Sequence, residues 1–214
     1  FVGAPVGEAL SGFWQGAFGG RRHAYLMATL SRSALIVGMA ISVMLSFRAG
    51  LFNIGGEGQL VAGGLAAALI AILLPGPPLV VLVAAIAGAM LAGAAWALLA
   101  GVLQLYMGVP LLVGSLLLNY PIRYIGSYLV AHPFRDVPSG MVQSYLVPQA
   151  TWFAYFPGTR LDIGILFTLT ATAFALVYSY GTLHGYHTRL NGLSADFART
   201  VGLPVRRLTL QTLA

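Results

Sequence analysis

The sequence predicts an all-α protein, a polytopic transmembrane helix bundle, and three observations lead to this class. Of its 214 residues, 58% are hydrophobic and only 7% are charged. Soluble domains carry about 25% charged residues, because they need a solvated surface. Several apolar stretches are long enough to cross a hydrocarbon core of about 30 Å, which takes about 20 helical residues. Glycine and alanine recur in these stretches and allow helices to pack closely against one another.

Five stretches are expected to span the bilayer as helices. They cover residues 25–47, 51–74, 79–105, 111–130 and 163–180. Proline and glycine at 75–78 and at 108–110 interrupt the apolar sequence, since proline lacks a backbone donor and fixes φ. A further apolar run at 208–214 is expected to open another helix. The sequence therefore predicts about five full spans and the beginning of one more.

Composition also excludes several classes of protein. The 11 basic residues are all arginine and are scattered, which excludes a basic face for nucleic acid. Without lysine the chain cannot form a P-loop, so it has no standard ATPase site of its own. Without cysteine it has no disulfide, thiol nucleophile or cysteine metal site. No catalytic set of side chains is found in one segment, and His184 and His187 lack a third ligand, so we expect neither an enzyme nor a metal site.

The arginine distribution predicts the orientation in the membrane. Residues 182–207 hold four arginines against one aspartate, which places this loop in the cytoplasm by the positive-inside rule. Alternation of the spans then places two further turns inside and two loops outside. The inner turns are at Arg48 and 106–110, and the outer loops are 75–78 and 132–162. Arg21 and Arg22 fall outside in this arrangement and favour the opposite orientation, which stays open.

The most unusual segment is 48–59, where polar residues and four glycines interrupt the apolar pattern. Glu57 is the only carboxylate between Glu8 and Asp136. A carboxylate at membrane depth faces a cavity or a partner, and irregular backbone is tolerated there only beside protein or water. This pattern favours a broken helix that lines a solute pathway. The alternative is a plain turn over 48–58, with the span beginning at Gln59, and Glu57 either contacts solute or pairs with an arginine such as Arg48.

Asn119 and Ser115 are polar residues in an otherwise apolar expected span, and their spacing of four residues puts them on one helix face. They form interhelical hydrogen bonds or contact a solute. We take five residues as candidates for lining the pathway: Asn53, Glu57, Gln59, Ser115 and Asn119.

Residues 194–201 predict a short helix in the basic loop, with Ser194 as its cap and Gly202 and Pro204 at its end. Its apolar face consists of Ala195, Phe197, Ala198 and Val201. An apolar face on a cytoplasmic helix predicts a docking surface, or else a helix that lies on the membrane.

The sequence GLFNIGGEGQ at 50–59, followed by a Gly/Ala-rich apolar run, resembles the permease subunits of bacterial ABC importers. This group includes branched-chain amino acid and ribose permeases, and the likeness is greatest to the nucleoside-type branch with FNIG-x-EGQ. Three more segments resemble the family in the same order, so the likeness covers nearly the whole chain. They are 28–50, 108–120 and 183–207.

The resemblance implies a permease subunit of the bacterial cytoplasmic (inner) membrane, which carries nucleosides or similar small polar solutes. Residues 1–214 would form one incomplete permease domain that lacks an N-terminal span and a C-terminal part. Residues 182–207 would be its cytoplasmic loop, with a coupling helix that contacts an ABC ATPase through Ser194, Ala195, Phe197, Ala198, Val201 and Gly202.

The implied partners are a second permease subunit in a heterodimer, the ATPase with its ATP and Mg²⁺, an extracytoplasmic solute-binding protein and the bilayer. The resemblance implies no cofactor in this chain and no nucleic acid. Alternatives are a sugar, flavin or branched-chain amino acid ABC permease, or a self-contained secondary transporter that uses Glu57 as a proton or cation site.

Overall fold

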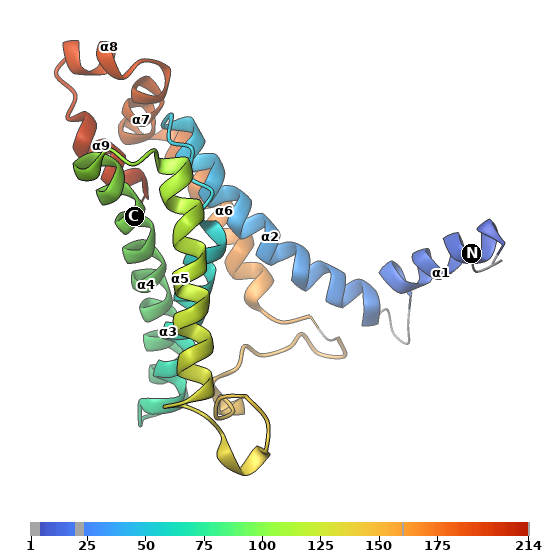
Figure 1. Cartoon of the computed structure of the whole chain (residues 1–214). Helices are drawn as coiled ribbons and strands as arrows, with labels where there is room; N and C mark the ends of the chain where they lie inside the picture. The colour runs from blue at the N-terminus through green and yellow to red at the C-terminus, as the bar shows by residue number, and fades with distance from the viewer. Residues whose placement is uncertain (1–4, 20–23, 160, 214) are drawn as a thin grey trace. The chain divides into compact units, whose positions relative to one another are not determined.

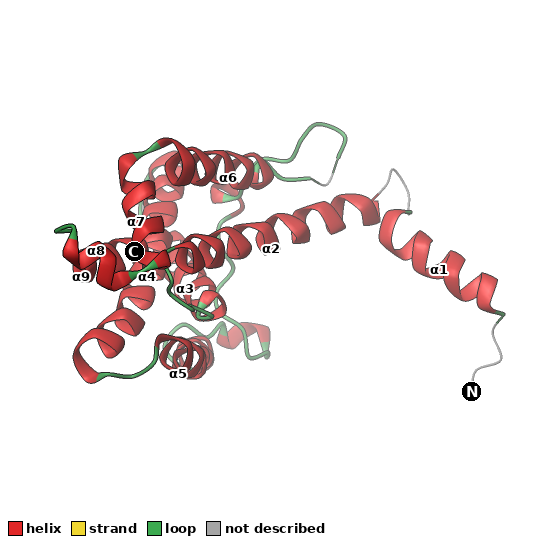
Figure 2. Ribbon diagram, turned by 90° about the horizontal axis from the view of Figure 1, so that it is seen from above, coloured by secondary structure: helices red, strands yellow, loops and turns green. Residues whose placement is uncertain are grey.

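The computed structural model describes residues 5–19, 24–159 and 161–213, and this part of the chain is almost entirely helical. Figure 2 shows helices joined by loops, and the described residues form no strand beyond two isolated bridges. The predicted all-α class is thus confirmed. The helices are, in chain order, α1 (Val6–Phe18), α2 (Ala24–Arg48), α3 (Gly56–Leu73), α4 (Pro78–Met107), α5 (Leu111–Ala131), α6 (Gly164–Gly181), α7 (Leu183–Leu193), α8 (Ala195–Thr200) and α9 (Val205–Leu213).

Four helices in the described part are long and apolar enough to cross a membrane, namely α2, α3, α4 and α6. They coincide with four of the five expected spans. The fifth, α5, also forms where the sequence predicts it and has 21 residues, a length of about 30 Å. It is less apolar than the others because it carries Ser115, Asn119 and Arg123.

The chain divides into two compact units. The first unit comprises residues 1–40 and 153–175, and therefore contains α1 and the first parts of α2 and α6. The exposed aromatic residues of α1 include Trp14 and Phe18, whose rings lie 4.7 Å apart. Arg21 and Arg22, which weaken the orientation argument, lie outside the described residues.

The second unit comprises 41–152 and 176–214 and holds the closest helix packing. In it α3, α4 and α5 run alongside one another (Figure 1). Glycine permits this approach, because a Cβ added at Gly63 would lie 3.0 Å from the carbonyl oxygen of Ala89 in α4. A Cβ at Gly126 of α5 would similarly lie 3.0 Å from the side chain of Leu65 in α3. These contacts agree with the small-residue packing that the sequence predicts.

Between α2 and α3 the backbone is irregular over residues 49–55, and Gly50 takes a left-handed φ of 74°. The helix resumes at Gly56, so Glu57 and Gln59 belong to its first turns. The span therefore begins three residues earlier than a plain turn over 48–58 would place it. Within this segment Ala49, Leu51 and Asn53 are buried, whereas Phe52 and Ile54 are 59% and 45% exposed. That it lines a solute pathway stays a prediction.

One end of the second unit gathers elements that are distant in sequence. The side-chain amide of Asn191 in α7 donates to the carbonyl oxygen of Ala49 at 3.4 Å. Around this contact a small core forms from Ala49, Leu51, Ala97, Ala100, Leu111 and Leu213. One end of the unit thus holds the turn at Arg48, the 107–110 turn and the α7–α9 segment (Figure 1). The opposite end holds the loops 75–78 and 132–152. This is the grouping that alternation predicts, and the side that faces the cytoplasm stays a prediction.

Candidate functional site

Two side chains of α5 hold the beginning of α3 by accepting hydrogen bonds from its backbone. The hydroxyl oxygen of Ser115 accepts from the N–H of Ile54 at 3.1 Å. One turn further along α5, Oδ1 of Asn119 accepts from the N–H of Gly58 at 2.9 Å. Both side chains are buried. Gly58 is in the first turn of α3, where N–H groups have no intrahelical partner, and Ile54 lies just before the helix. Both contacts satisfy backbone donors that would otherwise be orphaned in an apolar bundle.

Asn53 has the same kind of role within the irregular segment. Its Oδ1 accepts from the N–H of Gly55, two residues later, at 2.9 Å. This local turn is a common use of asparagine and directs the chain into α3. Asn53 is buried, so it supports the backbone and does not project into open space.

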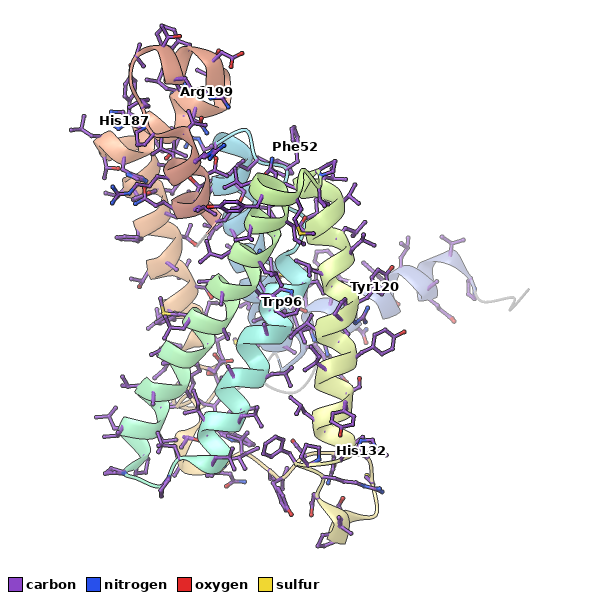
Figure 3. All side chains as sticks on the ribbon, turned by 60° about the vertical axis from the view of Figure 1, so that its left-hand side comes forward. Phe52, Trp96, Tyr120, His132, His187 and Arg199 are labelled. Carbon is purple, nitrogen blue, oxygen red and sulfur yellow. The ribbon has the colours of Figure 1, made fainter. Side chains whose placement is uncertain are left out.

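Glycines in the motif make these contacts possible. A Cβ added at Gly58 would lie 2.7 Å from Oδ1 of Asn119 and 2.9 Å from the indole nitrogen of Trp96. A Cβ at Gly55 would lie 3.1 Å from Oδ1 of Asn53. Trp96 belongs to α4 and lies among the helices in Figure 3. The glycines therefore let α3 approach both α4 and α5 at the point where its backbone donors are satisfied.

Glu57 is the exposed member of the candidate set, and it forms an ion pair with Arg123 of α5. Its Oε1 lies 3.4 Å from Nη1 of Arg123, and the two side chains are 53% and 61% exposed respectively. Glu57 thus pairs with an arginine, as one of the two alternatives predicts, but this arginine is Arg123 and not Arg48, the example given. Arg48 ends α2, and its guanidinium lies 4.0 Å above the ring of Tyr180. The partner is Arg123 because it lies one helical turn beyond Asn119, which already contacts the first turn of α3.

The ion pair lies near the middle of α5. Arg123 is the thirteenth of its 21 residues, so about 12 Å of helix or more extends on either side. Charged side chains at such a depth avoid lipid and face water or protein.

The last candidate, Gln59, is half-buried, and its Oε1 accepts from the hydroxyl of Ser42 in α2 at 3.4 Å. The structure thus brings the five predicted residues to one level of the bundle but gives them different surroundings. Asn53, Ser115 and Asn119 bind backbone N–H groups, Gln59 contacts α2, and Glu57 is half-exposed.

Sequence reasoning missed the surroundings of Glu57. Tyr120 and Tyr124, which lie three residues before Arg123 and one residue after it, are 57% and 74% exposed, and Tyr120 is on the outer side of α5 in Figure 3. Arg123 also borders a shallow groove of about 430 Å³ between α3 and α5. The spacing of Asn119 and Arg123 by four residues was the available signal, because it places both on one helix face.

The short helix in the basic loop forms as α8, with the predicted caps. Ser194 Oγ accepts from the N–H of Phe197 at 3.2 Å. Gly202 follows the helix with a φ of 82°, and the N–H of Leu203 returns to the carbonyl oxygen of Ala198 at 2.9 Å. This is the Schellman arrangement, in which glycine takes the left-handed position.

The predicted apolar face of α8 divides into two parts. Ala198 is fully buried and Ala195 is half-buried, so they fix the helix to its own chain. Phe197 and Val201 are 54% and 52% exposed and form the surface that is open to a partner. Asp196 and Arg199 pair with each other at 3.1 Å within the helix.

The two histidines of the loop lie beside aromatic rings. The His184 ring centroid is 5.6 Å from that of Tyr178, and the His187 centroid is 6.2 Å from that of Tyr186. Across residues 5–19, 24–159 and 161–213, no group of three or more metal-ligating side chains comes together.

The chain is similar to several known transport proteins. The chain is 26% identical over 213 residues to the guanosine ABC transporter permease protein NupP of Bacillus subtilis (strain 168), a match that covers 96% of this chain and 59% of that protein. It is 28% identical over 189 residues to the glucose ABC transporter permease protein TsgB13 of Haloferax volcanii, covering 83% of this chain and 50% of the relative. The nucleoside ABC transporter permease protein NupB of Lactococcus lactis subsp. cremoris is 22% identical over 189 residues, covering 84% and 52%.

The chain therefore spans between half and three-fifths of the length of these relatives. No solved structure matches it significantly. Residues 25–214, which include the irregular segment, α5 and α8, match the family model described as branched-chain amino acid transport system / permease component. The chain belongs to this family of membrane permeases.

Proposed function

We propose that the chain forms part of the translocation pathway of an ABC importer in the bacterial cytoplasmic membrane, and that its solute is a nucleoside or a similar small polar molecule. The family match and the two relatives with nucleoside or guanosine in their names support this proposal. Chemistry on the solute is not required, because the chain would move it unchanged.

The observation that carries the proposal is the half-exposed ion pair of Glu57 and Arg123. Arg123 lies near the middle of the 21-residue helix α5 and pairs there with Glu57 of α3, so both charges need water or protein around them. An aqueous route bordered by α3 and α5 supplies that surrounding. Transporters commonly bind solute near the bilayer midplane, where a helix is interrupted.

Each part of the site has a task in this proposal. Ser115 and Asn119 bind the backbone of Ile54 and Gly58 to α5, and Asn53 fixes the turn before α3. Glu57 is thereby presented at a fixed level. The carboxylate accepts hydrogen bonds from ribose hydroxyls or base N–H groups. Tyr120, three residues before Arg123 in α5, offers an exposed ring on which a nucleobase stacks.

The proposed partners act at the two ends of the pathway. Outside, a solute-binding protein delivers the solute. Inside, an ABC ATPase that binds ATP and Mg²⁺ contacts the exposed Phe197 and Val201 of α8. A second permease subunit, in a heterodimer, completes the route. Alternating access then requires that the ATPase favour the inward and outward states unequally in its different nucleotide states.

Uptake by the reconstituted importer tests the function. The full-length permease and its ATPase are reconstituted in proteoliposomes, and the binding protein is added outside. Entry of labelled guanosine is then followed with and without ATP enclosed in the vesicles. We expect saturable entry that needs both ATP and the binding protein. Entry that proceeds without ATP and stops when the ion gradient is collapsed would instead establish a secondary transporter with Glu57 as its ion site.

A sugar is the second candidate solute, because the Haloferax volcanii relative is named a glucose permease. Competition separates the two classes. Excess unlabelled guanosine is expected to abolish entry of labelled guanosine, whereas glucose has no effect. Riboflavin and leucine serve as competitors for the flavin and branched-chain amino acid alternatives.

A further inference from the structure

A cleft in the first unit has a composition that the transport pathway does not explain. It encloses about 740 Å³ and is formed by the first turns of α2 and by the segment that leads into α6. Its lining residues are Tyr25, Ala28, Ser31, Arg32, Tyr155, Thr159 and Asp162. The two candidate spans in this unit begin at Tyr25 and at Gly164, so the cleft lies where the apolar helices start, which is the depth of lipid head groups.

Arg32 supplies to this cleft a cation that pairs with no residue in the described part of the chain. It lies eight residues after the start of α2, about 12 Å along an apolar helix. The structure gives it no ion pair or hydrogen bond with any residue it describes. An arginine inside a span extends its side chain toward the membrane surface and seeks an anion there.

Asp162 supplies an anion on the other wall. Its Oδ1 accepts from the N–H of Gly164 at 2.8 Å, which fixes the carboxylate at the first residue of α6. The backbones of Asp162 and Tyr155 also form an isolated antiparallel β-bridge, which orders the segment. Within the described ranges, Arg32 and Asp162 line one cleft without forming an ion pair. The space between them therefore suits a zwitterionic ligand, with a negative group toward Arg32 and a positive group toward Asp162.

We propose that this cleft binds the head group of a phospholipid of the phosphatidylethanolamine class. The phosphodiester accepts hydrogen bonds from the Arg32 guanidinium, which matches phosphate in a two-pronged geometry. The primary ammonium lies against Asp162. Tyr25 and Tyr155 are both about half exposed, and tyrosine is favoured at this depth because its ring is apolar and its hydroxyl is polar.

Charge distinguishes this ligand from the other common head groups. A phosphatidylglycerol head group carries only the phosphate, which Arg32 attracts and Asp162 repels. A phosphatidylcholine head group has both charges, but its trimethylammonium has no N–H to donate to the carboxylate. The proposal is independent of the transported solute, because it uses no residue of the Glu57 site.

The test measures lipid binding to the full-length protein, purified in detergent and stripped of lipid. Native mass spectrometry follows titration with phosphatidylethanolamine, phosphatidylglycerol and phosphatidylcholine, and with soluble phosphoethanolamine. We expect phosphatidylethanolamine to bind about tenfold more tightly than either other lipid, since a charge-assisted hydrogen bond accounts for about that ratio. Arg32→Gln should weaken its binding about tenfold.

Asp162→Asn is the sharper variant, because asparagine keeps the Oδ1 that caps α6 and removes only the charge. We expect it to abolish the preference for phosphatidylethanolamine over phosphatidylglycerol. Arg206→Gln, at an exposed arginine of α9, is the matched control and should leave lipid binding unchanged. If Arg32→Gln does not fold, Arg32→Lys keeps the charge and should weaken binding by a smaller factor.

Three results would overturn the proposal. Equal binding of phosphatidylethanolamine and phosphatidylglycerol would mean an anion site. Soluble phosphoethanolamine that binds as tightly as the lipid would mean a site for a free phosphate compound. Displacement of the lipid by guanosine would assign the cleft to the transported solute.

Discussion

At the scale of single residues, the polar side chains around the start of α3 form two groups. Asn53, Ser115 and Asn119 are buried and accept hydrogen bonds from the backbone. Glu57 and Arg123 are half-exposed and pair with each other. Substitution in the first group is expected to change stability, whereas substitution in the second is expected to change transport.

Glu57→Gln tests the second group. An ion pair whose side chains are more than half exposed adds at most about 1 kcal/mol to the free energy of unfolding, so we expect the melting temperature to change little. Initial uptake should fall about tenfold, because the solute loses a charge-assisted hydrogen bond. Glu8→Gln, in the exposed helix α1, is the control. Wild-type uptake by Glu57→Gln would exclude a role for the charge.

Exchange of the two charges separates solute contact from pairing. The double variant Glu57→Arg with Arg123→Glu keeps an ion pair between α3 and α5 but reverses its direction. If the carboxylate contacts the solute, uptake stays as low as in Glu57→Gln. Recovery to near wild-type uptake would show that only the pairing matters.

Gly58→Ala tests the close approach of α3. The added methyl would lie 2.7 Å from Oδ1 of Asn119 and 2.9 Å from the indole nitrogen of Trp96. We expect a loss of about 1–3 kcal/mol in the free energy of unfolding, because a well-packed site is overfilled. Gly64→Ala is the matched control in the same helix, since its Cβ would meet nothing within 4 Å. Thermal unfolding in nanodiscs should show the control equal to or more stable than wild type, and equal effects of the two substitutions would contradict the packing argument.

At the scale of elements, the sequence predicted the positions of the membrane-spanning helices, but it did not predict the residue at which α3 begins. A run of about 20 apolar residues bounded by proline or glycine predicts a span from local information. The N–H of Gly58 is instead satisfied by Asn119, which is 61 positions away. A tertiary contact therefore decides that the helix begins at Gly56. The same reason explains why Arg123 was missed, because its partner lies in another helix.

The caps of α8 were predictable because they are local. Ser194 and Gly202 satisfy the ends of a short helix within their own turn, so residue type and spacing were sufficient. The direction in which each apolar side chain points was not predictable. Ala198 is buried by the packing of α8 against α7 and α9, which are separate elements in the sequence.

Phe197→Asp tests α8 as the element that contacts the ATPase. The ring is more than half exposed, so its replacement should leave the permease folded. We expect ATP hydrolysis stimulated by the loaded binding protein to fall about tenfold or more, as for an aromatic residue at the centre of an interface. Leu183→Asp places the same charge at an exposed position of α7 and is the control. Equal stimulation of Phe197→Asp and wild type would remove α8 from the contact.

At the scale of the whole molecule, the sequence predicted which loops share an end of the second unit but only weakly which end faces the cytoplasm. Alternation of spans gives the grouping because each helix reverses the chain, and the contact between Asn191 and Ala49 agrees with it. The side depends on arginine counts that nearly balance. Residues 182–207 carry the main signal.

Labelling of single cysteines measures that orientation directly, and the sequence has no native cysteine to remove. Leu146→Cys introduces a thiol at an 81% exposed position in the loop after α5, and Arg206→Cys introduces one at an exposed position in α9. With a membrane-impermeant maleimide on intact spheroplasts, we expect Leu146→Cys to react at once and Arg206→Cys to react only after permeabilisation. The positive-inside bias of 182–207 is the physical reason for this order. The reverse order would mean the opposite membrane topology. It would place α8 on the outer face, where no ATPase could reach it.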